Sequence, residues 1–191
     1  MKKKTVLIHS NFTRAFTGFG KNKKNIMRYL YDTGKYNLIE LANGIEWEAP
    51  STKLLPWTCR GSLPRPQEMQ GLTTEQQREQ GYGSKLVDRA IKEFKPDVYI
   101  GMEDIWAFNG YHTKPWWKVN TMIWTTLDSL PILPQAIEYA PKIKNYYVWA
   151  SFAEKAMNEL GYNNVKTLRG SLDKNNFYKL SDDRRDTLRK N

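Results

Sequence analysis

The chain has 191 residues and a formal net charge of +10, and 40% of its residues are hydrophobic. This length and composition are typical of one domain with a sizeable core, and every apolar run is far shorter than the ~20 residues of a membrane-spanning helix. The first lysines precede an apolar stretch that is too short for a signal peptide, so we expect a cytoplasmic protein without a transmembrane segment.

Cysteine and histidine are scarce in this sequence. Cys59 is the single cysteine, and His9 and His112 are the two histidines, so neither an internal disulfide nor a zinc-type cluster of Cys and His can form. We therefore expect no metal and no cofactor, and a metal held by carboxylates alone stays open without a motif that supports it. The positive charge favours anionic partners such as nucleotides, nucleic acid or an anionic lipid surface, although charge alone says nothing about the fold.

The N-terminal forty residues have the pattern of a strand, a helix and a second strand. Residues 5–10, "TVLIHS", form a short apolar run that fits a buried central strand. Apolar residues recur at helical spacing over 26–30, and Gly34 supplies a stop for that helix. Residues 36–42, "YNLIELA", predict the second strand, so the unit is typical of a parallel sheet with a right-handed crossover.

The least regular part of the chain is the stretch 43–80, which is rich in proline, glycine and glutamine. We expect a long excursion here, with one short strand near 54–57. Loops of this length are usually functional or mobile.

Regular elements return after this excursion. An apolar stripe over 86–94 predicts a helix, and the segments 95–104 and 119–129 predict strands. The segment 135–140 predicts a short helix that Pro141 ends.

A last helix and strand follow with clear end signals. Ser151 and Glu154 have the spacing of a capping box, Gly161 fits a helix C-terminus, and 165–168 predict a final short strand. The expected buried stripe of this helix is Phe152, Ala153, Ala156, Met157 and Leu160. The alternation predicts an open, mostly parallel, Rossmann-like α/β sheet with helices on both faces, which binds ligands outside the carboxyl ends of its strands.

The loop after the first strand, "SNFTRAFTGFGK", departs from the dinucleotide fingerprint GxGxxG. Gly18 and Gly20 match it, but Lys23 stands where the third glycine belongs. Glycines still permit close backbone approach, and the following helix offers free N–H groups at its N-terminus. Four side chains add positive charge there: Arg14, Lys21, Lys23 and Lys24. A phosphate-facing loop and a tight turn followed by a solvated basic face both remain open.

Three carboxylates follow predicted strands. Glu103 and Asp104 are adjacent, so they point to opposite sides in an extended chain; each fits a general base, a sugar ligand, a solvated side chain or a helix cap. Asp128 fits a turn former or a ligand contact equally well. Trp106 and His112 lie in the aromatic loop "IWAFNGYHTKPWW", whose rings suit packing, or stacking on sugars or bases.

The order of these segments resembles the N-terminal half of a GT-B type glycosyltransferase of the large retaining family called glycosyl transferases group 1. The similar segments are "SNFTRAFTGFGKNKKNIMRYL", "KPDVYIGMEDIW", "IWTTLDSLPI" and "YVWASFAEKAMNELGYNNVKTLRGSLDKNNFYKL". The last is the most specific, because its "G-x-x-D-x-x-x-F" tail, with Gly170, Asp173 and Phe177, follows at the family's spacing. The resemblance covers most of 4–180 apart from 43–80.

This resemblance implies two Rossmann-like domains that face a cleft, with the acceptor bound mainly by the first and a nucleotide-sugar donor by the second. The donor phosphates are then expected to face Gly18, Gly20, Lys21 and Arg14. The acceptor is expected at Glu103, Asp104 and Trp106, with Asp128 as the catalytic candidate. Transfer in most members needs no metal, and positive side chains and backbone donors stabilise the leaving diphosphate.

Two departures limit what carries over. Many members have a histidine at the end of the strand that corresponds to "IWTTLDS", whereas this chain has Leu127 followed by Asp128. The family's basic donor-binding residues and paired glutamates have no counterpart in the chain. We therefore expect residues 1–180 to form the acceptor-side domain, and 181–191 to begin a linker towards an absent second domain.

The expected function is thus an acceptor-binding half of a glycosyltransferase, inactive alone. Its expected partners are the missing C-terminal donor domain, in cis or in trans, and a sugar or glycoconjugate acceptor. Two other interpretations stay open: a non-enzymatic basic domain that binds nucleic acid or another polyanion, and a structural domain that only self-associates.

Overall fold

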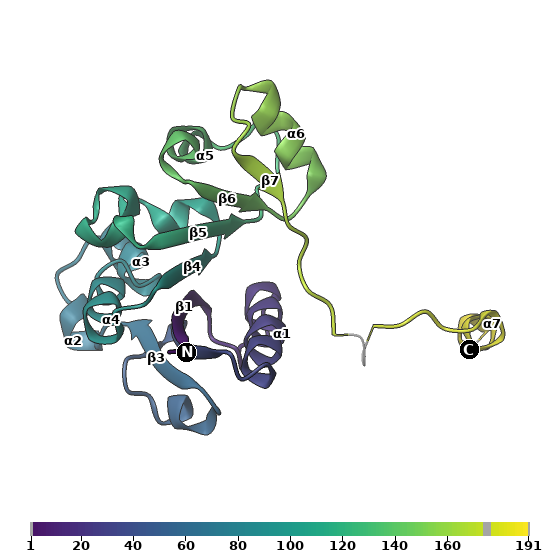
Figure 1. Cartoon of the computed structure of the whole chain (residues 1–191), viewed down its shortest axis with the longest axis horizontal. Coiled ribbons are helices and arrows are strands. Elements are labelled where there is room, and N and C mark those ends of the chain that lie inside the picture. The colour runs from purple at the N-terminus through teal and green to yellow at the C-terminus, as the bar shows by residue number, and fades with distance from the viewer. Residues whose placement is uncertain (1, 174–176, 191) are drawn as a thin grey trace.

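The computed structural model describes residues 2–173 and 177–190. It contains one seven-stranded sheet in the order β3-β2-β1-β4-β5-β6-β7, and every neighbouring pair of strands is parallel (Figure 1). The strands are β1 (Lys4–Asn11), β2 (Tyr36–Glu46), β3 (Thr58–Leu63), β4 (Val98–Met102), β5 (Asn120–Thr125), β6 (Asn145–Val148) and β7 (Val165–Thr167). The predicted Rossmann-like sheet is confirmed.

Helices cover both faces of the sheet. The longest, α1 (Gly18–Asp32), packs Met27 against strand residues such as Val6 and Met102 on one face. The opposite face carries the larger of the hydrophobic clusters and three helices: α4 (Leu86–Phe94), α5 (Pro134–Tyr139) and α6 (Ser151–Glu159). Because the strand order reverses direction between β1 and β4, the chain has its topological switch point there.

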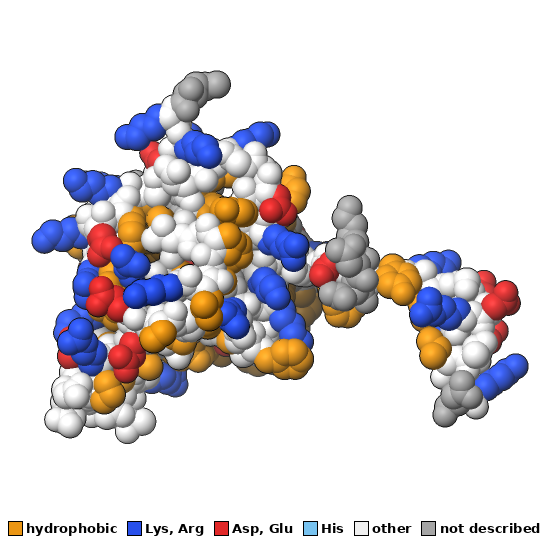
Figure 2. Space-filling view, turned by 90° about the horizontal axis from the view of Figure 1, so that it is seen from below, with side chains coloured by type: hydrophobic (Ala, Val, Ile, Leu, Met, Phe, Trp, Pro, Cys, Tyr) orange, Lys and Arg blue, Asp and Glu red, His pale blue; other side chains and the backbone are white. Residues whose placement is uncertain are grey.

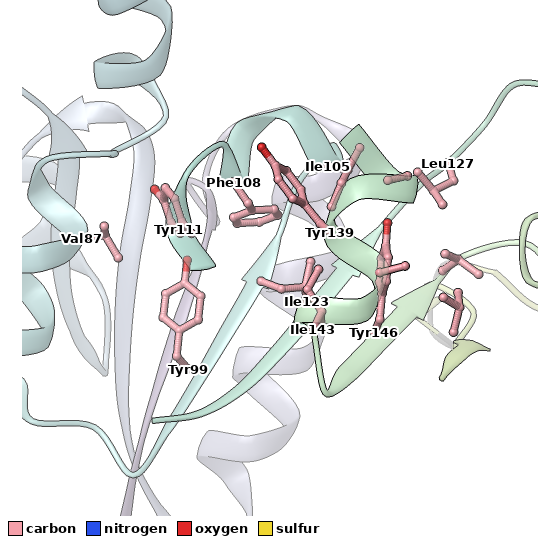
Figure 3. Close-up of a cluster of buried hydrophobic side chains, with 14 of the residues drawn as sticks. Val87, Tyr99, Ile105, Phe108, Tyr111, Ile123, Leu127, Tyr139, Ile143 and Tyr146 are labelled. Atoms are coloured by element: carbon pink, nitrogen blue, oxygen red, sulfur yellow. The ribbon is translucent and has the colours of Figure 1, made fainter. Parts of the chain in front are cut away.

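The core beneath α4, α5 and α6 is rich in tyrosine. Tyr99, Ile123 and Tyr146 come from the three neighbouring strands β4, β5 and β6, and all are fully buried (Figure 3). Two short 3-10 helices that follow β4 add further buried residues to this core: η2 (Ile105–Phe108) and η3 (Tyr111–Thr113). A third, η4 (Pro115–Lys118), packs the partly buried Trp116 and Trp117 against it.

The excursion 43–80 is more regular than its composition indicates. It contains the end of β2, η1 (Pro50–Leu54), β3, α2 (Pro66–Met69) and α3 (Thr74–Gly81). The strand expected at 54–57 was misplaced, because β3 begins at Thr58 and forms the sheet edge beside β2. All residues of α2 and α3 are described and none of them is buried, so these helices lack the apolar stripe that would reveal them in the sequence.

The last helix and strand were predicted in place, but two details were wrong. Ala150, not Ser151, is the N-cap of α6, and the Glu154 carboxylate instead accepts a hydrogen bond from the Thr167 amide at 2.8 Å. Phe152 and Leu160 are 43% and 52% exposed, so the buried stripe is narrower than expected.

The helix α5 runs into η5 (Ala140–Lys142), so Pro141 does not end it at once.

The chain crosses back to α1 after β7. The Ser171 amide and hydroxyl both donate to the side-chain oxygen of Asn22 on α1, at 2.6 and 2.7 Å, and Gly170 packs against Trp149. Beyond this contact, α7 (Asp182–Lys190) lies away from the sheet, and none of its nine described residues is buried (Figure 1). Through the described part of the chain, helices are too short or too polar to cross a membrane.

Candidate functional site at the switch point

The loop between β1 and α1 is fixed by hydrogen bonds to Thr17, the N-cap of α1. Its hydroxyl oxygen accepts from the Gly20 amide and from the Asn11 side chain, each at 3.0 Å. A Cβ added at Gly20 would lie 2.7 Å from the Phe12 carbonyl oxygen, so this glycine serves close packing inside the loop. A Cβ at Gly18 would meet no described atom within 4 Å, so Gly18 is the glycine that faces open space.

Two of the predicted cations lie on the rim of this loop. Arg14 and Lys21 are exposed, and the Lys21 ammonium lies 3.8 Å from the centre of the Phe16 ring. Phe16 is itself 91% exposed. The loop therefore presents an exposed positive charge and an apolar ring beside the N-terminus of α1, where helix N–H groups favour an anion.

Lys23 does not belong to this set, and the expectation that it adds charge to the loop was wrong. It is fully buried, and its ammonium lies 2.9 Å from the Glu40 carboxylate on β2 and donates to the Ser10 carbonyl oxygen at 2.9 Å. Burial lowers the pKa of Lys23, while the Glu40 charge acts in the opposite direction. The lysine that replaces the third glycine therefore ties α1 to β1 and β2.

Glu40 extends the same connection to the loop. Its carboxylate accepts from the backbone and side chain of Thr13, at 2.8 and 3.0 Å, and from the indole of Trp57 at 2.7 Å. A buried ion pair is weak support for stability in itself, but its hydrogen bonds define one geometry for the loop. Lys23 and Glu40 are thus positioning residues for the backbone around Gly18.

Glu103 lies on the other side of the switch point, directly after β4. It is 2% exposed, so it is not the solvated carboxylate that the sequence allowed. Its Oε1 atom accepts from the Asn43 side chain at 3.0 Å and from the Ser10 hydroxyl at 3.5 Å. Burial raises the pKa of Glu103 to about 7, although the Asn43 hydrogen bond and the charge of Lys23 oppose this. The carboxyl can therefore hold or release a proton near neutral pH.

His9 is joined to Glu103 through Asn43. Its Nε2 atom lies 2.8 Å from Asn43 Oδ1, and its Nδ1 atom lies 2.9 Å from the Tyr99 hydroxyl. Because the Asn43 amide group donates to Glu103, its oxygen is left to accept from His9 and from Ser62. Burial lowers the pKa of His9 to about 3, so the ring is neutral at physiological pH.

This polar network was missed by sequence reasoning. The signal was a polar residue at the carboxyl end of each of the first three strands, namely His9, Asn43 and Ser62. Their convergence depends on the register between strands, which pairs His9 with Leu41 and with Gly101.

The end of the excursion covers the network. Gly83 has a φ of +82°, and a Cβ there would lie 2.8 Å from the Ser62 side chain and 2.9 Å from His9 Nε2. Burial raises the pKa of the neighbouring Tyr82, and the charges of Glu103 and Asp104 raise it further. Gly83 therefore lies directly against His9 and Ser62.

Asp104 and Trp106 follow β4 in the chain. Asp104 faces the end of β5, and Trp106 faces the excursion. Asp104 accepts from the Thr126 hydroxyl at 2.7 Å, which joins the ends of β4 and β5. The Arg78 guanidinium lies 4.3 Å from the Trp106 ring centre, and the Tyr82 ring lies edge-on at 4.7 Å. Trp106 is thus held by Arg78 of the excursion and by Tyr82, which follows it.

Asp128 lies apart from this group. It follows the buried Leu127, whose φ of 42° is in the left-handed region, and its carboxylate is exposed beyond β5. Leu127 is a core residue, which explains why no polar group stands at that position. His112 lies on η3, where its Nε2 atom is 3.3 Å from the Lys142 ammonium. In the described ranges, His, Cys, Asp and Glu form no group of three that could hold a metal ion.

The three predicted residues after β4 thus face different partners: Glu103 bonds to Asn43 and Ser10, Asp104 bonds to Thr126, and Trp106 contacts Arg78 and Tyr82. The loop with Gly18 follows β1, the neighbouring strand at the switch point.

No protein-family model matches the chain, and no curated protein matches it. Among solved structures, the UDP-GlcNAc 2-epimerase from Methanocaldococcus jannaschii is similar, with 13% sequence identity and a TM-score of 0.47. The match covers 86% of this chain and 44% of that chain, so this chain spans less than half the length of that protein.

Proposed function

We propose that the chain is the acceptor-binding half of a nucleotide-sugar-dependent glycosyltransferase, and that it needs a donor-binding domain in cis or in trans. The observation that carries this proposal is the pairing of two different features across one switch point. An anion-favouring helix N-terminus with exposed cations lies after β1, and a buried carboxyl with an aromatic neighbour lies after β4.

The donor's diphosphate is assigned to the loop after β1. Gly18 allows close approach, and Lys21 and Arg14 supply positive charge where negative charge develops on the leaving group. Gly20 shapes the loop from inside instead of contacting the ligand. Since these groups cover only one side of a phosphate, the second domain supplies the rest of the donor site.

The acceptor is assigned to the side of β4 and β5. Asp104, which is partly exposed, would orient its hydroxyl groups directly, and Trp106 supplies apolar surface. Glu103 would act from beneath, through its hydrogen bonds with Asn43 and Ser10.

Asp128 remains the catalytic candidate because its exposed carboxylate follows the end of β5, where Thr126 bonds to Asp104. In the transfer, the acceptor hydroxyl oxygen bonds to the anomeric carbon while the bond from this carbon to the diphosphate breaks, and the hydroxyl proton passes to the Asp128 carboxylate.

Calorimetry with nucleotide-sugars tests this proposal. The isolated chain is expected to bind a UDP- or GDP-sugar with a Kd weaker than about 1 mM, since it holds part of the donor site. Fusing the donor-binding domain of a retaining GT-B enzyme after the chain is expected to tighten binding, and Lys21→Met should weaken it again. Tight binding by the isolated chain would contradict the half-enzyme proposal.

A second candidate is a non-enzymatic domain that binds nucleic acid or another polyanion. It is favoured by the net charge of +10 and by the lysine and arginine side chains spread over the face shown in Figure 2. Binding of this kind releases counterions and therefore weakens steeply with salt. A fluorescence titration with single-stranded DNA or RNA at two salt concentrations separates the candidates, because absence of binding at low salt removes this one.

A further inference from the structure

A hollow of about 230 Å³ lies between α3, η2 and α5, on the acceptor side of the switch point. Its lining residues are Glu75, Arg78, Glu79, Tyr82, Trp106, Ala107, Asn109, Gln135, Glu138 and Tyr139. Residues of the excursion and its end form one wall, and this is the part of the chain that the glycosyltransferase resemblance leaves out. The hollow is therefore a feature of this chain that the resemblance does not supply.

Hydrogen bonds join the three walls of the hollow. The Tyr139 hydroxyl on α5 donates to the Asn109 side-chain oxygen at 2.5 Å, and the Asn109 amide group donates to the Glu79 carboxylate on α3 at 3.0 Å. Arg78 is held over Trp106 at 4.3 Å. Side chains that are already fixed lose less conformational entropy when a ligand binds, so the hollow is preorganised.

The lining offers the groups that recognise a hydroxylated ring. Carboxylates such as Glu79 accept hydrogen bonds, the Arg78 guanidinium donates, and the Gln135 amide does both. Tyr82 and Tyr139 add ring surface for the apolar C–H groups of a sugar. Planar acceptors and donors beside aromatic rings suit a molecule whose hydroxyl groups both donate and accept.

The charge and the size of the hollow further limit the kinds of ligand that it can bind. The lining holds three carboxylates and one guanidinium in a chain of net charge +10, so it disfavours the phosphates that the rest of the surface attracts. Its volume is below the ~300 Å³ at which pockets for drug-sized ligands begin, so it suits one ring and not an extended chain.

We propose that this hollow binds a single sugar ring that carries free hydroxyl groups and no phosphate. The assignment of this ring to the acceptor rests on the proposed function, whereas the binding itself does not. The excursion then selects which acceptor is held, because α3 supplies Glu75, Arg78 and Glu79.

NMR titration of the ¹⁵N-labelled chain tests the proposal without any nucleotide. Methyl glycosides of neutral hexoses are the probes, and the Trp106 indole signal, assigned with Trp106→Phe, is the reporter. A weak, roughly millimolar, saturable shift is expected at Trp106, with shifts of the Asn109 and Gln135 side-chain amides. A hexose 6-phosphate should bind more weakly than the neutral sugar.

Matched variants locate the site. Glu79→Gln removes a charged acceptor and should weaken binding roughly tenfold, and Gln135→Ala, on the exposed side of α5, should also weaken it. Glu48→Gln makes the same charge change in the exposed segment after β2 and should have no effect.

Two kinds of result overturn this inference. One is that no probe sugar shifts Trp106, or that neither Glu79→Gln nor Gln135→Ala alters binding. The other is that the hexose phosphate binds as tightly as the neutral sugar. These NMR results do not depend on the calorimetry with nucleotide-sugars. If a sugar binds in the hollow but the fused chain does not bind a nucleotide-sugar, the proposed function is refuted and the inference about the hollow stands.

Discussion

Lys23 shows how the burial of one side chain changes the role that the sequence suggests for it. Its position in the sequence looks like a lost glycine in a phosphate motif, yet its ammonium is buried against Glu40 and the Ser10 carbonyl oxygen. Glu103 is the converse case, since a carboxylate that fitted a solvated position is buried and bonded to Asn43. In both cases the chemistry is set by a partner far away in the sequence.

Removing the Lys23 amine should strongly destabilise the folded chain. Lys23→Met leaves the Glu40 carboxylate buried without its counter-charge, and we expect the free energy of unfolding to fall by about 3–5 kcal/mol. Lys21→Met, an exposed neighbour on the same helix, should change it by less than about 0.5 kcal/mol. Urea denaturation measures both, and equal effects would show that the buried pair is not special.

Glu103 predicts a pH dependence with a definite sign. Because its pKa is raised from 4.5 to about 7 in the folded chain, its carboxyl favours folding in the protonated form. That contribution is complete below about pH 4.5 and is lost as the pH rises through 7, at a cost of up to about 3 kcal/mol.

Glu103→Gln should abolish this dependence. The variant keeps an oxygen that accepts from Asn43, so its stability relative to the parent chain should rise between pH 5 and pH 8. Thermal unfolding across this range measures the difference. A stability difference that does not vary with pH would mean that Glu103 titrates normally.

The helix α1 is the element on which the donor assignment depends. Its first turn is shaped by the Thr17 cap, and its body is held to the sheet by Lys23 and to the chain after β7 by Asn22. The element therefore connects the anion-favouring loop with the segment that follows β7.

The two glycines of α1 should differ in their tolerance of a methyl group. Gly20→Ala forces the carbonyl oxygens of Phe12 and Ala15 to move, so we expect a loss of about 1–3 kcal/mol in the free energy of unfolding. Gly18→Ala meets open space and should leave stability unchanged, or raise it by up to about 1 kcal/mol. Chemical denaturation of the pair checks this, and the reverse order would refute the packing role of Gly20.

At the scale of the whole molecule, α7 should be dispensable for folding. None of its described residues is buried, and the hydrogen bonds of Ser171 to α1 lie before the deleted segment. Deleting 181–191 should therefore shift the free energy of unfolding by less than about 0.5 kcal/mol. A loss above 2 kcal/mol in urea denaturation would show that α7 packs on the domain in solution.

The sheet could be predicted from the sequence because its strands are apolar runs between clear turn signals. The helices α2 and α3 could not, since polar residues on every side give no periodicity. The site was predicted in part. Glu103, Asp104 and Trp106 follow β4 as expected, whereas the network of His9 and Asn43 depends on strand register. The failed capping box at Ser151 has the same origin, because Glu154 bonds to a residue of β7.

The excursion also bears on how such a chain can diversify. Its segment 64–81 joins an edge strand to α4 and contributes nothing to the hydrophobic clusters of the described residues. Insertions, deletions or wholesale replacement of this segment would therefore spare the core while rebuilding one wall of the hollow. Substitution of this segment, in evolution or by engineering, can therefore change which ligand is bound while the sheet and its core stay the same.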